Sequence, residues 1–182
     1  MVLRFLFLFL IITSCDSTIL PKQRGFFAPE FSYPSYKILE SCNHSFKIND
    51  LTNVISKPDC NYEIMYNELN AKIYFSNIIV ENNMEIISRK FDEKVFNNSE
   101  FADQILTSEF SNPYKDVFSE VYFFVGESPS NIQFFITDST KNFLSASLLF
   151  DSKPNYDSLL PYIHYIRNDI KKIIESFDWS SK

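Results

Sequence analysis

The segment Asp138-Ser139-Thr140-Lys141 combines a carboxylate, two hydroxyls and an amine, the groups from which a Ser–Lys nucleophile is built. Such a nucleophile needs a buried lysine, because only a desolvated amine loses its proton readily. Here the four residues lie between two apolar runs, as the tip of a hairpin does. Asp, Ser and Thr at a tip usually hydrogen-bond their own backbone. We therefore predict that this segment closes a turn and is not an active site.

Residues able to hold a metal or a phosphate are scarce. The 182 residues include two glycines, two histidines and three cysteines. Gly25 and Gly126 stand too far apart for a phosphate-binding loop, a dinucleotide fingerprint or a nucleophile elbow. His44 and His164 do not form an H-E-x-x-H motif, and other roles are expected for the cysteines. The sequence therefore predicts no catalytic residue, no metal site and no cofactor.

The charge balance restricts the partners. The chain has 23 acidic and 17 basic residues, a net charge of −6, and no basic run longer than Lys171-Lys172. Without a basic stripe it has nothing to neutralise a phosphate backbone, so we expect no nucleic-acid partner. The acidic residues between positions 81 and 100 lack the spacing of a calcium loop, which indicates a solvated helix face. We also expect no small-molecule substrate.

The first fifteen residues predict export and lipidation. Arg4 precedes the apolar stretch Phe5–Ile12, which is about half as long as a membrane-spanning helix. Ile12-Thr13-Ser14-Cys15 has the form of a bacterial lipobox, in which the cysteine is lipidated and becomes the new N-terminus. We predict a signal peptide over residues 1–14 and a lipid anchor on Cys15, which holds the protein at a membrane. An ordinary signal peptide is the alternative.

A lipidated tether is expected over residues 15–31. This stretch contains Pro21, Gly25 and Pro29 and shows no helical period. Aromatic residues gather toward its end and just beyond it, and they form a candidate partner surface: Phe26, Phe27, Phe31 and Tyr33. Their rings can dock on the protein's own domain or bind a partner, and the sequence leaves both possibilities open.

Residues 32–182 have the composition of a single α+β domain. Short strand-like runs are expected at Phe46–Ile48, Asn53–Ser56, Asn61–Tyr66 and Ala71–Asn77. A three-stranded meander is expected at Val117–Val125, Ile132–Thr137 and Phe143–Phe150. Helical spacing of apolar residues predicts a helix over Val80–Phe96 and a second short helix over Ser99–Ile105. The predicted architecture is an antiparallel sheet packed by two or three helices.

The chain is expected to end in a long helix. Apolar residues recur at helical spacing from Leu159 to Phe177, with Ser158 as the expected N-cap and Pro161 in the first turn. The last strand of the meander also has one apolar face. Because each surface is apolar on one side, we predict that the helix lies across the meander. The buried residues would be Ile163, Ile166, Ile170 and Phe177 of the helix, against Leu144, Ala146 and Leu148 of the strand.

Two segments carry a resemblance to a known family. Gln133–Phe150 reads QFFITDSTKNFLSASLLF, and Pro154–Trp179 reads PNYDSLLPYIHYIRNDIKKIIESFDW. Together they resemble the C-terminal half of the gliding-motility lipoprotein GldD of Bacteroidetes. The lipobox cysteine, the segment PKQRGFF and the two inner cysteines also stand where that family places equivalents. The resemblance covers essentially the whole chain. It implies a lipoprotein that works with the gliding machinery and the associated type IX secretion apparatus, and it brings no enzymatic activity.

Cys42 and Cys60 are predicted to form a disulfide. Lipidation uses the third cysteine, and export places the domain in an oxidising compartment. Each of the two cysteines adjoins a strand-like run, with turns between them, so they can approach each other across a hairpin. The alternative is a pair of buried free thiols.

Two classes of function remain. The first is a lipid-anchored, non-enzymatic cell-envelope protein that faces the periplasm and supports gliding motility and type IX secretion, with other proteins of that machinery as partners. The second is a periplasmic hydrolase or carbohydrate-binding lipoprotein, for which aromatic richness is the only indication. A deep pocket with converging carboxylates would favour the second, and a flat aromatic patch the first.

Overall fold

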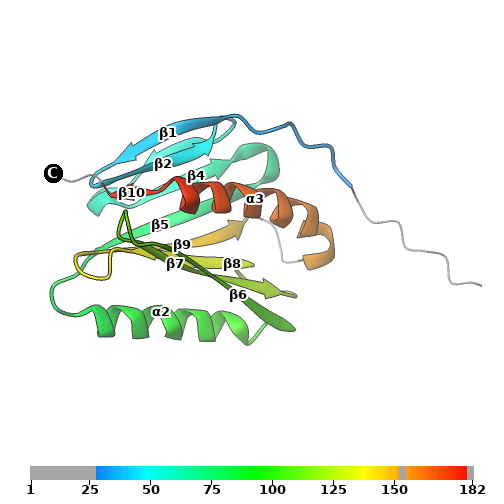
Figure 1. The fold of residues 1–182 in the computed structure, drawn as a ribbon. Coiled ribbons are helices and arrows are strands. Elements are labelled where there is room, and N and C mark those ends of the chain that lie inside the picture. The colour runs from blue at the N-terminus through cyan, green and yellow to red at the C-terminus, as the bar shows by residue number, and fades with distance from the viewer. Residues whose placement is uncertain (1–27, 152–154, 180–182) are drawn as a thin grey trace, which may run out of the picture.

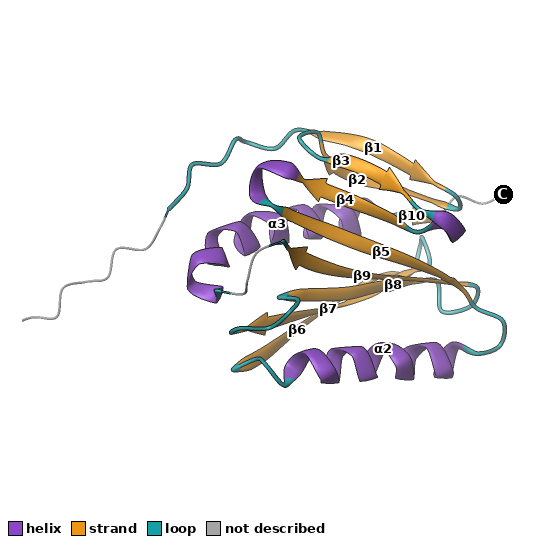
Figure 2. Ribbon diagram, turned by 180° about the vertical axis from the view of Figure 1, so that it is seen from behind, coloured by secondary structure: helices purple, strands orange, loops and turns teal. Residues whose placement is uncertain are grey.

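The computed structural model describes residues 28–151 and 155–179, which form three layers (Figure 1). Helix α2 (Met84–Ser99) is one outer layer, and a seven-stranded sheet is the middle layer. Helix α3 (Tyr156–Ser176) lies beside a three-stranded sheet in the other outer layer, and Figure 2 shows the same arrangement from behind. The fold is α+β with antiparallel sheets and a long C-terminal helix, which confirms the predicted class.

Both sheets are antiparallel. The large sheet has the order β3-β4-β5-β9-β8-β7-β6. Its strands are β3 (Asn53–Ser56), β4 (Tyr62–Tyr66), β5 (Ala71–Ile79), β6 (Gln104–Asn112), β7 (Val117–Val125), β8 (Ile132–Thr137) and β9 (Asn142–Phe150). The small sheet has the order β1-β2-β10, with β1 (Tyr36–Ser41), β2 (His44–Asn49) and β10 (Asp178–Trp179). Two short 3-10 helices, η1 (Pro58–Cys60) and η2 (Asn67–Leu69), flank β4.

The large sheet is covered on both faces. One face packs against α3 and the small sheet, and the predicted contact between the last helix and the meander is confirmed. The residues predicted for it all belong to one core cluster: Leu144, Ala146, Leu148, Ile163, Ile166, Ile170 and Phe177. The other face packs against α2 through Ile87, Phe91 and Val95. Ser145 and Ser147 are therefore buried as well, although their polar character indicated an uncovered face.

Helix α3 begins earlier than expected. The N-cap is Asn155 and not Ser158, because the Asn155 side chain accepts a hydrogen bond from the Ser158 backbone N–H at 3.3 Å. Pro161 consequently lies inside the helix and not in its first turn. Its missing N–H removes the helical hydrogen bond to the carbonyl of Asp157.

The prediction of a short helix over Ser99–Ile105 is wrong. Helix α2 runs to Ser99, and β6 pairs with β7 along its whole length. Because β6 is an edge strand whose residues are mostly exposed, it lacks the alternation that marks a half-buried strand. Helix α2 also begins at Met84 and not at Val80, since the carbonyl of Asn83 accepts its first backbone hydrogen bonds.

The packing of α3 predicts a large stability effect at Ile170, which is 1% exposed. Replacing Ile170 with Ala should lower the free energy of unfolding by roughly 2–5 kcal/mol, because it leaves a cavity between helix and sheet. Urea denaturation followed by circular dichroism measures the change. The exposed neighbour offers the control, since Lys171→Ala should stay within about 0.5 kcal/mol of the parent. Equal effects of the two substitutions would show that α3 is not packed at Ile170.

Candidate functional site

Three of the predicted site residues, Cys15, Phe26 and Phe27, lie outside the described residues. The other two aromatic residues of the candidate partner surface behave differently from each other. Tyr33 is fully exposed. Phe31 is partly buried against the domain. The structure thus separates residues that the sequence places in one group.

Phe31 docks on the side of α3. Its ring is stacked on that of Tyr165, with 4.6 Å between centroids and 17° between planes. The ring of Tyr162 meets it edge-on at 5.8 Å. Of the two possibilities that the sequence leaves open for this residue, the structure shows docking on the protein's own domain.

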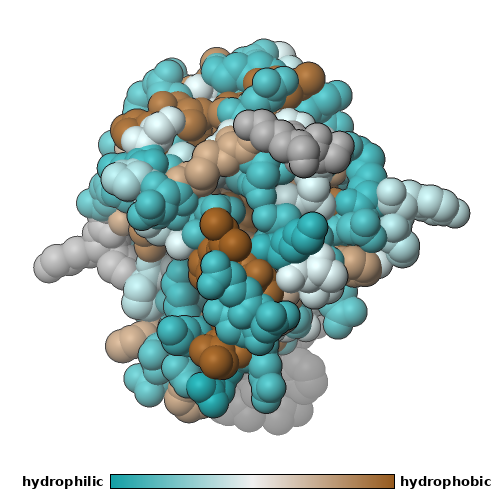
Figure 3. Space-filling view, turned by 90° about the vertical axis from the view of Figure 1, so that its left-hand side faces the viewer, coloured by the Kyte–Doolittle hydropathy of each residue, from teal (hydrophilic) through white to brown (hydrophobic). Residues whose placement is uncertain are grey.

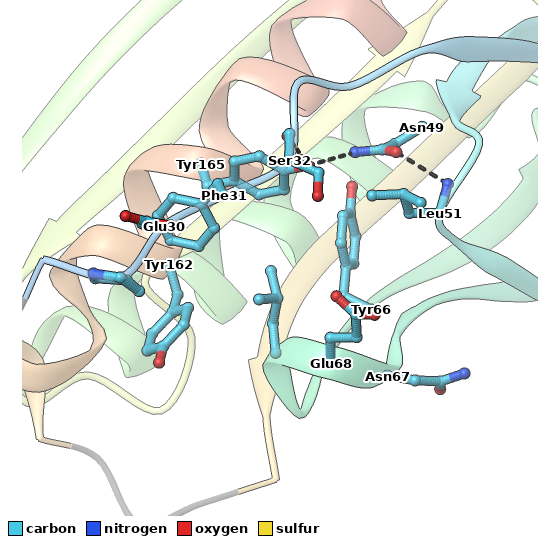
Figure 4. Close-up of a pocket in the computed structure, with 12 residues that line it drawn as sticks. Glu30, Phe31, Ser32, Asn49, Leu51, Tyr66, Asn67, Glu68, Tyr162 and Tyr165 are labelled. Atoms are coloured by element: carbon cyan, nitrogen blue, oxygen red, sulfur yellow. Dashed lines mark hydrogen bonds between the residues drawn. The ribbon is translucent and has the colours of Figure 1, made fainter.

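The docked segment forms one wall of a pocket of about 210 Å³ (Figure 4). The pocket lies between the first described residues, α3, the end of β2 and η2. Four aromatic rings, two carboxylates and several smaller side chains surround it. The lining residues are Pro29, Glu30, Phe31, Ser32, Asn49, Leu51, Tyr66, Asn67, Glu68, Leu69, Tyr162 and Tyr165.

A buried carboxylate lies behind this pocket. Asp169 of α3 is 1% exposed. It accepts hydrogen bonds from Tyr36 Oη at 2.9 Å, from Asn49 Nδ2 at 2.9 Å and from Tyr66 Oη at 3.1 Å. The three donors belong to β1, β2 and β4. One side chain therefore joins both sheets to the C-terminal helix.

The ionisation of this network follows from its burial. Burial raises the pKa of Asp169, while the three donors act in the opposite direction because they favour the ionised form. Burial first, and then the neighbouring Asp169 carboxylate, raise the pKa of Tyr36 and Tyr66 well above the ordinary value of a phenol. Both phenols therefore remain protonated donors at physiological pH. The network holds its members in place, and the Asp169 carboxylate is too deeply buried to contact a substrate.

Asn49 connects the network to the pocket wall. Its Nδ2 donates to Tyr165 Oη at 3.0 Å as well as to Asp169, and its Oδ1 accepts from the backbone N–H of Leu51 at 3.0 Å (Figure 4). Tyr165 Oη donates in turn to the carbonyl of Ser32 at 3.4 Å. The side-chain donors of Asn49, Tyr66 and Tyr165 are thus all engaged within the protein.

The lining of the pocket suits noncovalent binding. Among the described residues it contains no histidine, cysteine, lysine or arginine, so these residues supply no Ser–His, Cys–His or Ser–Lys pair for nucleophilic catalysis. Across residues 28–151 and 155–179, no group of three or more His, Cys, Asp or Glu residues is placed to hold a metal ion. Within the same ranges no helix is long and apolar enough to cross a membrane.

A comparison with protein families matches residues 16–179 to the gliding motility lipoprotein GldD. The chain belongs to the GldD family. Membership implies a role in gliding motility and association with the cell envelope. No curated protein and no solved structure gives a significant match.

In this member of the GldD family, residues 138–141 close a turn, as predicted. Asp138 Oδ1 accepts hydrogen bonds from the backbone N–H groups of Thr140, Lys141 and Asn142, at 2.9, 2.7 and 2.9 Å. Burial acts to raise the pKa of Asp138, but the hydrogen bonds outweigh it and lower that pKa. Lys141 is exposed. The carboxylate is committed to its own turn, and the amine is not desolvated as a catalytic lysine would be.

His44 of β2 belongs to the buried interior. It is 1% exposed, since β2 is the central strand of the small sheet. Its Nδ1 lies 3.1 Å from Asn43 Oδ1, and its Nε2 lies 2.9 Å from Tyr62 Oη. An amide oxygen only accepts, so Nδ1 carries the proton and Nε2 accepts from the tyrosine. Burial lowers the pKa of His44 to about 4. His164 is exposed.

Cys42 and Cys60 form the predicted disulfide, with their Cα atoms 6.1 Å apart. Cys42 lies in the turn between β1 and β2, and Cys60 ends η1 just before β4. The bond therefore ties the small sheet to the large one at the end of β2 remote from Asn49.

Figure 3 shows the face of the molecule that lies on the left-hand side of Figure 1. On this face hydrophobic patches are separated by hydrophilic side chains.

Sequence reasoning missed the buried network. Asp169 had a usable signal, because it stands three residues after Ile166 and next to Ile170 on the apolar stripe of α3. An acidic residue in such a stripe indicates a buried carboxylate with donors around it. Tyr36 and Tyr66 carry no local signal, because they lie 133 and 103 positions from Asp169 in the chain.

The network predicts that Asp169→Asn destabilises the protein. An amide presents N–H groups where the carboxylate accepts, so at least one of the three donors loses its partner in a buried site. We expect a loss of roughly 1–3 kcal/mol in the free energy of unfolding, measured by urea denaturation. Glu175→Gln, an exposed substitution of the same kind on the same helix, should change it by less than about 0.5 kcal/mol. Equal stability of the two variants would contradict the network.

Buried His44 predicts a loss of stability in mild acid. Its native pKa of about 4 lies below the ordinary value of 6.5, so the unfolded chain binds the extra proton between those two pH values. Stability therefore falls as the pH drops from 6.5 to 4, by at most about 3 kcal/mol from this residue. Denaturation of the parent and of His44→Gln at pH 7 and pH 4.5 isolates the effect, which the variant should lose. Exposed His164→Gln should keep it, and a parent-like pH dependence in His44→Gln would refute the assignment.

Proposed function

We propose that this protein is a non-enzymatic lipoprotein that is held in a membrane by lipid on Cys15 and faces the periplasm. In this role it supports gliding motility and the associated type IX secretion machinery by binding another protein of that machinery. The observation that carries the proposal is the family match over residues 16–179. The lipobox at Cys15 supplies the argument for the anchor, and an anchored domain acts on partners at the membrane surface.

The described site supports a binding role. The pocket presents ring faces and carboxylates without a nucleophile and its base. The most reactive combination in the sequence, residues 138–141, has its carboxylate engaged by three backbone N–H groups. The described pocket lining thus supplies no such pair, and the carboxylate of residues 138–141 is committed to its own turn.

The alternative of a periplasmic hydrolase or carbohydrate-binding lipoprotein has less support. The aromatic rings around the pocket favour a sugar. However, sugar hydroxyls need donors as well as acceptors, and the amide of Asn49 and the hydroxyls of Tyr66 and Tyr165 already donate within the protein. The pocket carboxylates, Glu30 and Glu68, are exposed and not desolvated as a general acid would be.

Gene deletion tests the proposed function. In a gliding bacterium that carries a family member, deletion should abolish colony spreading and reduce type IX secretion, and expression of this chain should restore both. Cys15→Ala should fail to restore them and should lose fatty-acid labelling, because the anchor is removed. Lys141→Met should restore them fully, since the amine has no catalytic task. Normal spreading and secretion in the deletion strain would overturn the assignment. Failure of Lys141→Met with the fold intact would favour an enzyme.

A further inference from the structure

We propose that the pocket beside Phe31 binds the side chain of an arginine that a partner protein presents. The inference rests on the proposed binding function and names the chemistry of its partner. The pocket lies between the first described residues, α3 and η2, and Figure 4 shows rings of Phe31, Tyr66 and Tyr162 around it.

The charge of the lining selects a cation. Glu30 and Glu68 are the charged residues of the described lining, and no described lysine, arginine or histidine accompanies them there. The groove between α3 and β6 offers a comparison, because its lining mixes Glu109 and Glu175 with basic residues. An anion entering the pocket beside Phe31 would meet two carboxylates and no counter-charge.

The hydrogen-bonding state of the lining points the same way. Asn49 Nδ2 donates to Tyr165 Oη and to Asp169, Tyr66 Oη donates to Asp169, and Tyr165 Oη donates to a backbone carbonyl. The carboxylates of Glu30 and Glu68 and the ring faces remain for a ligand, and they are acceptors. Ser32 and Asn67, also in the lining, can donate as well as accept. A guanidinium has five N–H donors and no acceptor, so its requirements match those of the lining.

Shape distinguishes arginine from other cations. A planar guanidinium stacks on aromatic rings and also pairs with carboxylates in a fork geometry, whereas an ammonium is a compact, strongly hydrated charge. A volume of about 210 Å³ accommodates one such side chain and not a whole structural element. A zwitterionic lipid headgroup is disfavoured, because its phosphate would lie against Glu30 and Glu68. A single buried arginine at the centre of an interface is a common binding hot spot.

A titration tests this inference on the mature lipoprotein in neutral detergent. The probe is N-acetyl-arginine methylamide, and its neutral control is N-acetyl-citrulline methylamide, which has almost the same shape. The methyl resonances of Leu51 and Leu69, which line the pocket, should shift saturably with the arginine probe and not with the citrulline one. The double variant Glu30→Gln/Glu68→Gln should bind the probe about tenfold more weakly. The control Glu109→Gln/Glu175→Gln, in the other groove, should bind like the parent.

Three outcomes would overturn the proposal. Equal binding of both probes would remove the role of charge, and parent-like binding by Glu30→Gln/Glu68→Gln would remove the role of the carboxylates. Tighter binding of the probe by Arg24→Gln would show that the chain's own arginine fills the pocket. None of these outcomes bears on the deletion phenotype. The proposal of arginine binding can therefore be wrong while the proposed role in gliding is right, and the reverse also holds. Restored spreading by Glu109→Gln/Glu175→Gln, with loss for Glu30→Gln/Glu68→Gln, would connect the pocket to that role.

Discussion

The burial of one carboxylate organises this fold. Asp169 enters the core with an apolar helix stripe, and a charge in such a place is tolerated only when donors surround it. Those donors come from β1, β2 and β4. The requirement therefore fixes how the small sheet and the C-terminal helix lie on the large sheet. It also fixes the positions of Tyr66 and Asn49, which are part of the pocket lining. The shape of the pocket therefore depends on hydrogen bonds made in the core.

Much of the fold was predictable because it follows local periodicity. The meander β7-β8-β9 and the long last helix have apolar patterns that match their burial. Prediction fails where burial depends on distant partners. β1 has no fully buried residue and is paired with β2, and edge strand β6 lacks alternation, so neither has a clear pattern. His44 is buried because α3 and β10 return to cover it, and nothing nearby in the sequence indicates this.

The candidate site was predictable only in part, for the same reason. The aromatic end of the tether stands out in the sequence, and the disulfide follows from the number of cysteines and the expected compartment. The pocket itself combines residues from positions 29 to 165, so no motif describes it. Part of its character comes from the core, because the donors of Asn49, Tyr66 and Tyr165 already bind Asp169, one another and the chain's own backbone.

The wall of the pocket is also the first docked part of the described chain. A force that pulls on the N-terminal end of this chain therefore acts on the pocket wall before it acts on the sheets. A pull on Ala28 acts first on the Phe31–Tyr165 stack and the hydrogen bond from Tyr165 to Ser32, before it reaches β1, which is paired with β2 over six residues. A ring contact of this kind contributes only about 0.5–1.5 kcal/mol beyond its buried area. Tension along the chain would thus open the pocket wall while the sheets stay folded, and an occupant that seals the wall would resist that tension.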